Sequence, residues 1–191
     1  DVEREIRPGR WPLAEARLKH EAWYVARQMV SLLGEIGGAE AIPALESAYG
    51  HSEPRVKKEV MKSFVKIGTP RATAFLVGKL QEEDPSLVAQ AIISLGMLKD
   101  PASIEPLAAI ASKRENFSDL IDPQKEAIKA LGIIGDARAV SHLVKILSRK
   151  VWFGKKANDE VSSLAALSLG MIGTHEAMQA VMEASSDASG E

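Results

Sequence analysis

The sequence predicts an all-α protein: an α-α superhelix of about five antiparallel helix pairs, with a short helix before the first pair. Two observations favour this fold. A short segment ending in glycine recurs along the chain, and apolar residues recur at helical spacing on both sides of it. In the best copy, 130–140, Gly135 is expected to close a first helix (helix A), and a second (helix B) follows after a short turn. The corresponding closing residues, called anchors below, are Gly37, Gly68, Lys99, Gly135 and Gly173.

Positions counted from the anchors agree among the copies. The residue one before the anchor and the residue eight after it are aliphatic in all five. The first set is Ile36, Ile67, Leu98, Ile134 and Ile172, and the second is Leu45, Leu76, Leu107, Leu143 and Val181. One helix pair cannot bury such stripes alone, whereas stacked neighbours can. The sequence therefore predicts a stack of helix pairs.

The composition excludes some classes of function but does not identify the function. The chain has 191 residues, a formal net charge of -2 and no cysteine. The charge gives no global attraction for nucleic acid or an anionic membrane. The absence of cysteine excludes disulfides, thiolate metal sites and a cysteine nucleophile. No apolar run approaches the roughly 20 residues of a membrane span, and we expect a cytoplasmic protein. Because the chain begins with Asp1 and a large aromatic, Trp23, opens the first pair, we expect a fragment of a longer protein.

The turns between the helices contain residue types that are known to end and begin helices. Glycine at an anchor can adopt the left-handed conformation that closes a helix. After four of the anchors comes a residue of a type that caps helix N-termini. Proline is tolerated at the first helical position, because the N–H that it lacks would have no hydrogen-bond partner there. The expected caps of helix B are Thr69, Asp100, Asp136 and Thr174, followed by Pro70 and Pro101 in two copies; those of helix A are Asp84-Pro85 and Asp122-Pro123.

A second set of glycines lies inside helix A, three residues before the anchor. Each costs a helix about 1 kcal/mol relative to alanine. We expect the cost to be offset by a close helix crossing that a side chain would block. The set is Gly34, Gly96, Gly132 and Gly170, with Val65 in the second copy, where we expect a wider crossing.

The pattern resembles a known family. An Ala-Leu-Gly-x-Ile-Gly-Asp segment inside 127–147, followed by an aliphatic helix B, is similar to the short bacterial HEAT-like repeats, also called phycobilin-lyase-type HEAT repeats. The resemblance covers roughly Trp23 to Glu183. It implies a right-handed, armadillo-like α-solenoid that usually serves as a protein-binding surface. The expected divisions are a leader and capping helix at 1–22, a repeat domain at 23–184 and a disordered tail at 185–191. The expected repeats are 23–52, 53–83, 84–115, 121–150 and 158–184.

Two insertions interrupt the repeat, near 113–120 and 148–158. Both fall between helix B and the next helix A, so they should emerge on the same edge. We expect this edge to bind a partner, another protein or a domain of the same longer chain, because aromatic and cationic side chains are enriched at interface hot spots. The candidate partner-binding residues are Phe117, Lys150, Trp152, Phe153, Lys155 and Lys156. The plainer interpretation is a loop anchored on its own helices, and nucleic-acid binding by this basic cluster, with Lys145 and Arg149, is the alternative.

Enzymatic alternatives find less support. The pairs His20-Glu21 and His175-Glu176 resemble those of the HEAT-like di-iron hydroxylases that act on deoxyhypusine. However, His20 lies seventeen residues before its anchor and His175 lies two residues after its own, so they should not share a metal. The phycobilin-lyase branch of the resemblance would imply chromophore attachment, but no residue carries that activity specifically. We therefore expect no catalytic, cofactor-binding or metal-binding residues, and a non-catalytic scaffold for protein interactions.

Overall fold

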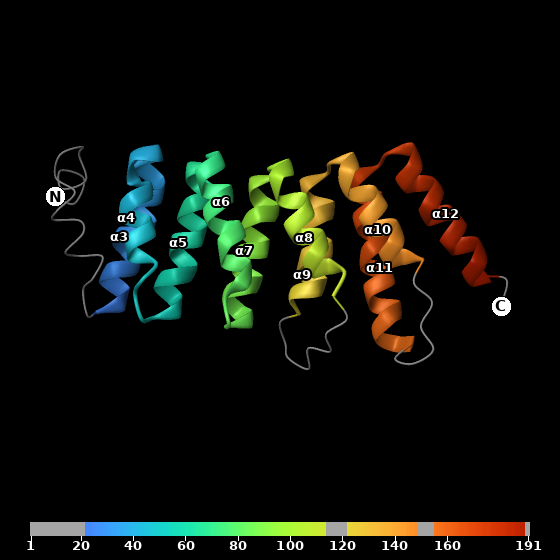
Figure 1. Cartoon of the computed structure of the whole chain (residues 1–191), viewed down its shortest axis with the longest axis horizontal. Coiled ribbons are helices and arrows are strands. Elements are labelled where there is room, and N and C mark those ends of the chain that lie inside the picture. Colours follow the sequence, from blue (N-terminus) through green and yellow to red (C-terminus); the bar gives the residue numbers. More distant parts are fainter. Residues whose placement is uncertain (1–21, 114–121, 149–154, 190–191) are drawn as a thin grey trace. The chain divides into compact units, whose positions relative to one another are not determined.

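The computed structural model describes residues 22–113, 122–148 and 155–189. Across these ranges it contains ten α-helices that follow one another in pairs (Figure 1), which confirms the predicted all-α fold of five helix pairs. The short helix expected within 1–22 falls almost wholly outside the described residues. The chain divides into two compact units, 1–94 and 95–191, whose boundary falls within helix α7.

The first unit contains the first two pairs and most of α7. Helix α5 packs against α3 and α4, the two helices of the preceding pair, and against α6, its own partner. The largest fully buried side chains here include Leu33, Leu45, Met61, Phe64 and Leu76. The elements are α3 (Trp23–Ile36), η1 (Gly38–Ala41), α4 (Ile42–Ala48), α5 (Pro54–Ile67), α6 (Pro70–Gly78), η2 (Lys79–Gln81) and α7 (Pro85–Leu98).

The second unit repeats this arrangement. Helix α11 packs against both helices of the preceding pair, α9 and α10, and α9 packs against α8. Leu95, Ile104, Leu107, Ile128 and Leu131 are fully buried. The elements after α7 are η3 (Pro101–Ser103), α8 (Ile104–Ala111), α9 (Pro123–Ile134), η4 (Ala137–Ala139), α10 (Val140–Leu147), α11 (Lys155–Ile172) and α12 (His175–Ser189).

The predicted caps are confirmed. The side chains of Thr69, Asp100, Asp136 and Thr174 each accept a hydrogen bond from a backbone N–H two or three residues later, as do Asp84 and Asp122. Hydrogen bonds from the side chain and backbone of Arg138 lower the pKa of Asp136 to about 2. The polar residues that follow the anchors thus end one helix and begin the next.

The anchors close helix A as predicted in four of the five copies. Gly68, Gly135 and Gly173 have φ of 64°, 74° and 68°, and Lys99 adopts the same left-handed conformation at 53°. The expectation for Gly37 is wrong: its φ is -82°, and Gly38 has the positive φ instead. Helix A still ends at Ile36, one residue before the anchor, and with two successive glycines the left-handed conformation falls on the second of them.

The glycines inside helix A lie at close crossings, as predicted, in three copies. A Cβ on Gly34 would lie 2.5 Å from Ser63 Cβ, one on Gly96 would lie 3.0 Å from Ala130 Cβ, and one on Gly132 would lie 2.8 Å from Ser168 Cα. In each case the neighbour belongs to helix A of the following pair. The hydroxyls of Ser63 and Ser168 also donate hydrogen bonds of 2.9 Å to the carbonyls of Val30 and Ile128 in the preceding helix A.

The ends of the described chain show two further features. The guanidinium of Arg55, in the following pair, lies 4.8 Å from the ring centroid of Trp23. Helix α12 continues to Ser189, so residues 185–189, assigned to a disordered tail, are helical. No glycine or proline interrupts this stretch before Gly190, and the Ser186 hydroxyl donates to the carbonyl of Glu183. Within the described ranges no helix is both long and apolar enough to cross a membrane.

The close crossings predict opposite effects for the same substitution at two glycines. Gly132→Ala should destabilise the fold by about 2 kcal/mol, because the new methyl group meets the backbone of Ser168. Gly170→Ala should stabilise it by about 0.5–1 kcal/mol, because no described atom lies within 4 Å of the new Cβ and alanine favours a helix. Urea unfolding followed by circular dichroism measures both values. Equal effects of the two substitutions would contradict the crossing.

A second prediction follows from the left-handed backbone conformation of Lys99. Lys99→Gly should stabilise the protein by about 1 kcal/mol, because a side chain in this conformation costs roughly 1–2 kcal/mol that glycine does not. Lys145→Gly, at an exposed position within α10, is the matched control and should destabilise by about 1 kcal/mol. The same unfolding experiment measures the change in stability of both variants. A loss of stability in Lys99→Gly would show that the anchor does not need the left-handed conformation.

Candidate functional site

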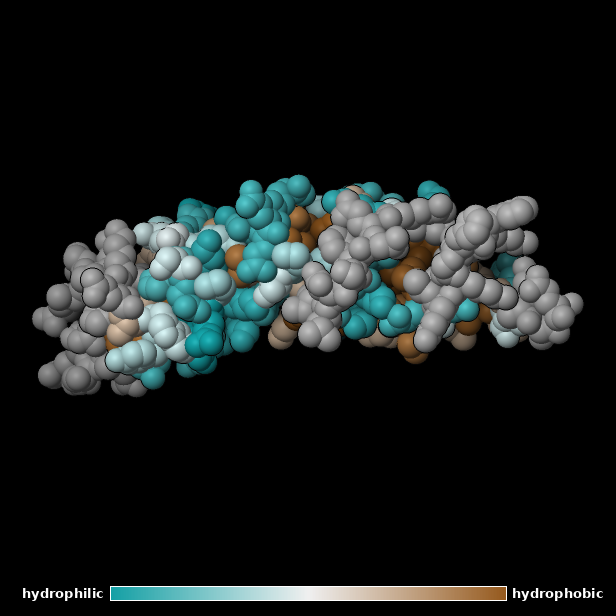
Figure 2. Space-filling view, turned by 90° about the horizontal axis from the view of Figure 1, so that it is seen from below, coloured by the Kyte–Doolittle hydropathy of each residue, from teal (hydrophilic) through white to brown (hydrophobic). Residues whose placement is uncertain are grey.

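Three exposed apolar side chains occupy the same place in consecutive repeats. Met97, Ile133 and Met171 each lie two residues before an anchor and are 61%, 38% and 58% exposed. We call these three residues the apolar ridge. All of them belong to the second unit. The ridge residues lie near the ends of the A helices, at the top of Figure 1, whereas Figure 2 shows the opposite edge, where the A helices begin.

The contacts of successive A helices place the ridge residues next to one another. Helix α9 packs against α11, and Gly96 of α7 faces Ala130 of α9. In the first unit the same position holds Glu35 and Lys66, and Lys66 Nζ lies 3.0 Å from Glu35 Oε1. Side chains two residues before consecutive anchors therefore reach each other. Where the first unit places an ion pair, the second unit places a row of apolar side chains.

The ridge is exposed because of its place around helix A. In the second unit the residue one position later is more buried: Ile134 is 8% exposed, and Leu98 and Ile172 are half-buried. One step along a helix rotates a side chain by about 100°, so the ridge residue before it points away from helix B. Methionine has a flexible and polarisable side chain that suits irregular partner surfaces. A contiguous row of this kind has the chemistry of a protein-binding patch.

The structure does not test the site predicted at the insertions. Phe117, Lys150, Trp152 and Phe153 lie outside the described residues. Lys155 and Lys156 form the first turn of α11, but their side chains are outside the described part of the molecule. Of the basic cluster considered for nucleic acid, Lys145 is described, and it is exposed on α10.

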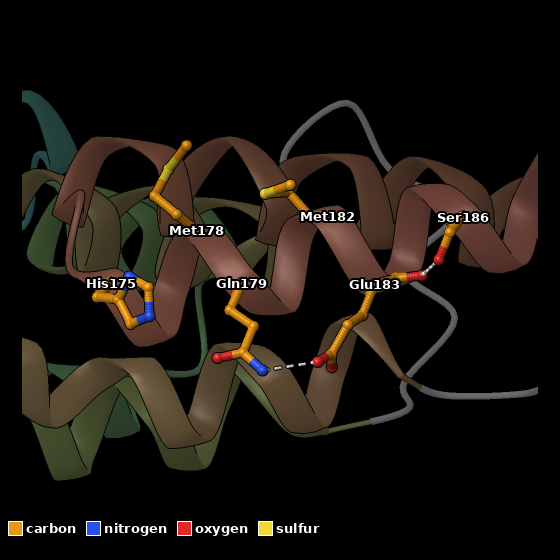
Figure 3. A pocket seen from close by; sticks show the side chains of 6 residues that line it. All are labelled: His175, Met178, Gln179, Met182, Glu183 and Ser186. Atoms are coloured by element: carbon orange, nitrogen blue, oxygen red, sulfur yellow. Dashed lines mark hydrogen bonds between the residues drawn. The ribbon is translucent and has the colours of Figure 1, made fainter.

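The His-Glu pair at the start of α12 lies on an open surface. His175 and Glu176 are exposed in the first turn of the helix, where the sequence predicted them. A shallow groove of about 480 Å³ runs beside them, and its described lining residues all belong to α12 (Figure 3). The lining residues are His175, Met178, Gln179, Met182, Glu183 and Ser186. Among the described residues no three His, Cys, Asp or Glu side chains gather as metal ligands would, and His20-Glu21 lies outside them.

A cluster of aromatic and cationic side chains that the sequence did not reveal lies in the first unit. The rings of Phe64 and Phe75 stack 4.3 Å apart, Tyr49 meets Phe75 edge-on, and Lys79 Nζ lies 4.3 Å from the Tyr49 ring centroid. Burial, aided by the carboxylates of Glu82 and Asp84, raises the pKa of Tyr49 well above its ordinary value, so the phenol stays neutral. Because Tyr49 is only 7% exposed, this cluster stabilises packing between α4, α5 and α6 instead of presenting a surface.

Comparison with known proteins identifies the repeat. The family model for HEAT repeats matches residues 12–90 and 80–154. The chain belongs to the HEAT-repeat family. The paired helices described above are therefore those of a HEAT-repeat solenoid, which typically mediates protein interactions. No curated protein sequence matches this one.

Solved structures share the HEAT fold at low identity. The complex of CpcE and CpcF of phycocyanin lyase from Nostoc sp. PCC7120 is 22% identical with a TM-score of 0.60, over 85% of this chain and 64% of that chain. Human deoxyhypusine hydroxylase in complex with glycerol is 19% identical with a TM-score of 0.58, over 95% of this chain and 67% of that chain. This chain thus spans about two thirds of each, and the likeness concerns the fold.

The apolar ridge was missed by sequence reasoning, although its signal was present. Met97, Ile133 and Met171 recur in register in the last three repeats. Each of them directly precedes a stripe residue. When two adjacent residues at the end of a helix are both apolar, the sequence pattern does not show which one is exposed. The distinguishing signal is the same position in the first two repeats, which holds the charged residues Glu35 and Lys66.

Proposed function

We propose that this HEAT-repeat module is a non-catalytic scaffold that binds another protein through the apolar ridge. The observation that carries the proposal is the in-register exposure of Met97, Ile133 and Met171. Burying a side chain of this size contributes roughly 1.5–3 kcal/mol, so three adjacent ones provide the apolar centre of a moderate interface. Charged side chains next to the ridge, including the ion pair of Lys129 and Glu126 on α9, provide a polar rim.

The ridge can be removed without disturbing the core. The triple variant Met97→Gln, Ile133→Gln and Met171→Gln should keep the stability of the wild type within about 1 kcal/mol, because the three positions are exposed. It should lose the proteins that the wild type enriches from a cell extract by at least roughly tenfold, as expected when hot-spot side chains are lost. Quantitative mass spectrometry of the captured proteins measures the loss.

The matched control substitutes exposed apolar residues away from the ridge. Tyr24→Gln with Ile36→Gln changes side chains of α3, in the first unit, that are 57% and 52% exposed. This variant should capture the same proteins as the wild type. If both variants retain the captured proteins, or both lose them, the ridge is not the binding surface.

The insertion that follows α10 is proposed as a second part of the same interface. It carries Lys150, Trp152 and Phe153, and Lys155 and Lys156 follow at the start of α11. The double variant Trp152→Ala and Phe153→Ala should weaken capture of the same proteins that the ridge variant loses, because aromatic anchors dominate hot spots. Loss of thermal stability with unchanged capture would instead show that the loop packs on its own helices.

The proposal of a scaffold without catalysis has a direct test. The His-Glu pair that suggested metal chemistry is represented in the described residues by His175 and Glu176, both exposed at the start of α12. Stoichiometric iron or zinc in the purified protein, measured by elemental analysis, would contradict the proposal.

A further inference from the structure

The methionines of the chain divide into a buried and an exposed group. The chain contains six methionines and no cysteine. Met29 and Met61 are 4% and 0% exposed in the core of the first unit. Met97 and Met171, on the apolar ridge, are 61% and 58% exposed, and the other two methionines are exposed on α12. Two of the three ridge residues are therefore methionines whose side chains are open to solvent.

The exposure of Met97 and Met171 comes from their position in the repeat. The residue two positions before the anchor is exposed in all five repeats, including the first two, where it is Glu35 and Lys66. Met171 is thus open for the same reason as Met97, and not because its helix pair is the last one described. Met178 differs, because the residue five positions after the anchor is buried in the four earlier repeats. The two ridge methionines therefore form a group that the repeat itself defines.

The thioether of an exposed methionine reacts with peroxides. Hydrogen peroxide transfers one oxygen atom to the sulfur: the O–O bond breaks, an S=O bond forms, the sulfur loses two electrons and the second oxygen leaves as water. Because the chain has no cysteine, it offers no thiol that could compete for the oxidant. Methionine sulfoxide reductases reverse the step with a thiol reductant, so the modification can act as a switch.

Oxidation changes the ridge but not the core. A sulfoxide is polar, and burying a polar group in an apolar interface without a hydrogen-bond partner is unfavourable. Ile133 stands on α9, between the A helices that carry the two methionines, and it has no sulfur to oxidise. Two sulfoxides would therefore flank one remaining apolar side chain. The fold itself should persist, because Met29 and Met61 are shielded from the oxidant.

We propose that Met97 and Met171 form a reversible oxidation site that switches the apolar ridge. With both thioethers reduced the ridge binds its protein partner, and with both oxidised it does not. This inference rests on the proposed function, because it assigns a regulation to the same surface. A partner bound to the ridge should in turn cover the two side chains and slow their oxidation.

The first experiment compares the methionines within one folded protein. Peptide mass spectrometry follows the conversion of each methionine in hydrogen peroxide. Met97 and Met171 should react at least roughly tenfold faster than Met29 and Met61, because the core excludes the oxidant. The midpoint of thermal unfolding should change by less than about 3 °C, since exposed positions contribute little to stability. Ridge methionines that react as slowly as the buried ones would overturn the proposal, as would unfolding of the treated protein.

The second experiment measures binding with matched variants, with the peroxide removed before cell extract is added. Oxidised wild type should lose, by roughly tenfold, the same proteins that the triple ridge variant loses. Treatment with methionine sulfoxide reductases should restore their capture. Met97→Leu with Met171→Leu keeps the apolar volume of the ridge and should capture these proteins equally before and after peroxide. Met178→Leu with Met182→Leu removes as many thioethers from α12, and its capture should still be lost on treatment.

The outcomes separate the switch from the proposed function. If untreated wild type captures nothing that the triple ridge variant loses, the proposed function fails and the switch fails with it. If untreated wild type captures those proteins and the oxidised protein captures them equally, ridge binding stands and the switch is overturned. A loss on oxidation that Met97→Leu with Met171→Leu shares would place the effect at another residue and would also overturn the switch.

Discussion

The stack depends on one contact, between a glycine in helix A and a small residue in the next helix A. At Gly132 a Cβ would lie only 2.8 Å from the backbone of Ser168, so the two helices approach more closely than any side chain permits. The Ser168 hydroxyl then reaches the carbonyl of Ile128. This approach brings the aliphatic stripes of both pairs into contact, and the gain outweighs the helix propensity that glycine gives up.

The backbone conformation at an anchor is determined more by the stacking of the helix pairs than by the type of residue at that position. Lys99 adopts a left-handed conformation that lysine disfavours, because helix A must end there for helix B to return along it. In the first copy the turn moves to Gly38, since either of two adjacent glycines can close the helix. The caps that follow are less variable: Asp100 and Asp136 each bind a backbone N–H that would otherwise have no partner.

Most of the fold could be predicted from the sequence because its signals are local. Thr69 indicates the start of a helix because threonine commonly caps helix N-termini. Gly34 indicates a close helix crossing because glycine recurs at the same position in other repeats. The surfaces could not be predicted in the same way. Whether Met97 or the neighbouring Leu98 faces the core depends on the rotation of helix A, which packing decides. Likewise Gly170 looks identical to Gly132 in the sequence and differs only because no described helix covers it. The predicted partner residues, such as Trp152, lie outside the described ranges and remain a prediction.

The crossing glycines also link stability to the shape of the proposed binding surface. The ridge residues Ile133 and Met171 stand on α9 and α11, whose separation is set by the contact of Gly132 with Ser168. A methyl group at Gly132 would meet the backbone of Ser168, so α9 and α11 must shift relative to each other, and the two ridge side chains shift with them. Under the proposed function, such a variant should lose stability and binding together. Changes at the ridge itself should alter binding alone, because its side chains are exposed in the described part of the chain. The two kinds of variant therefore separate the structural role of a repeat position from its role in recognition.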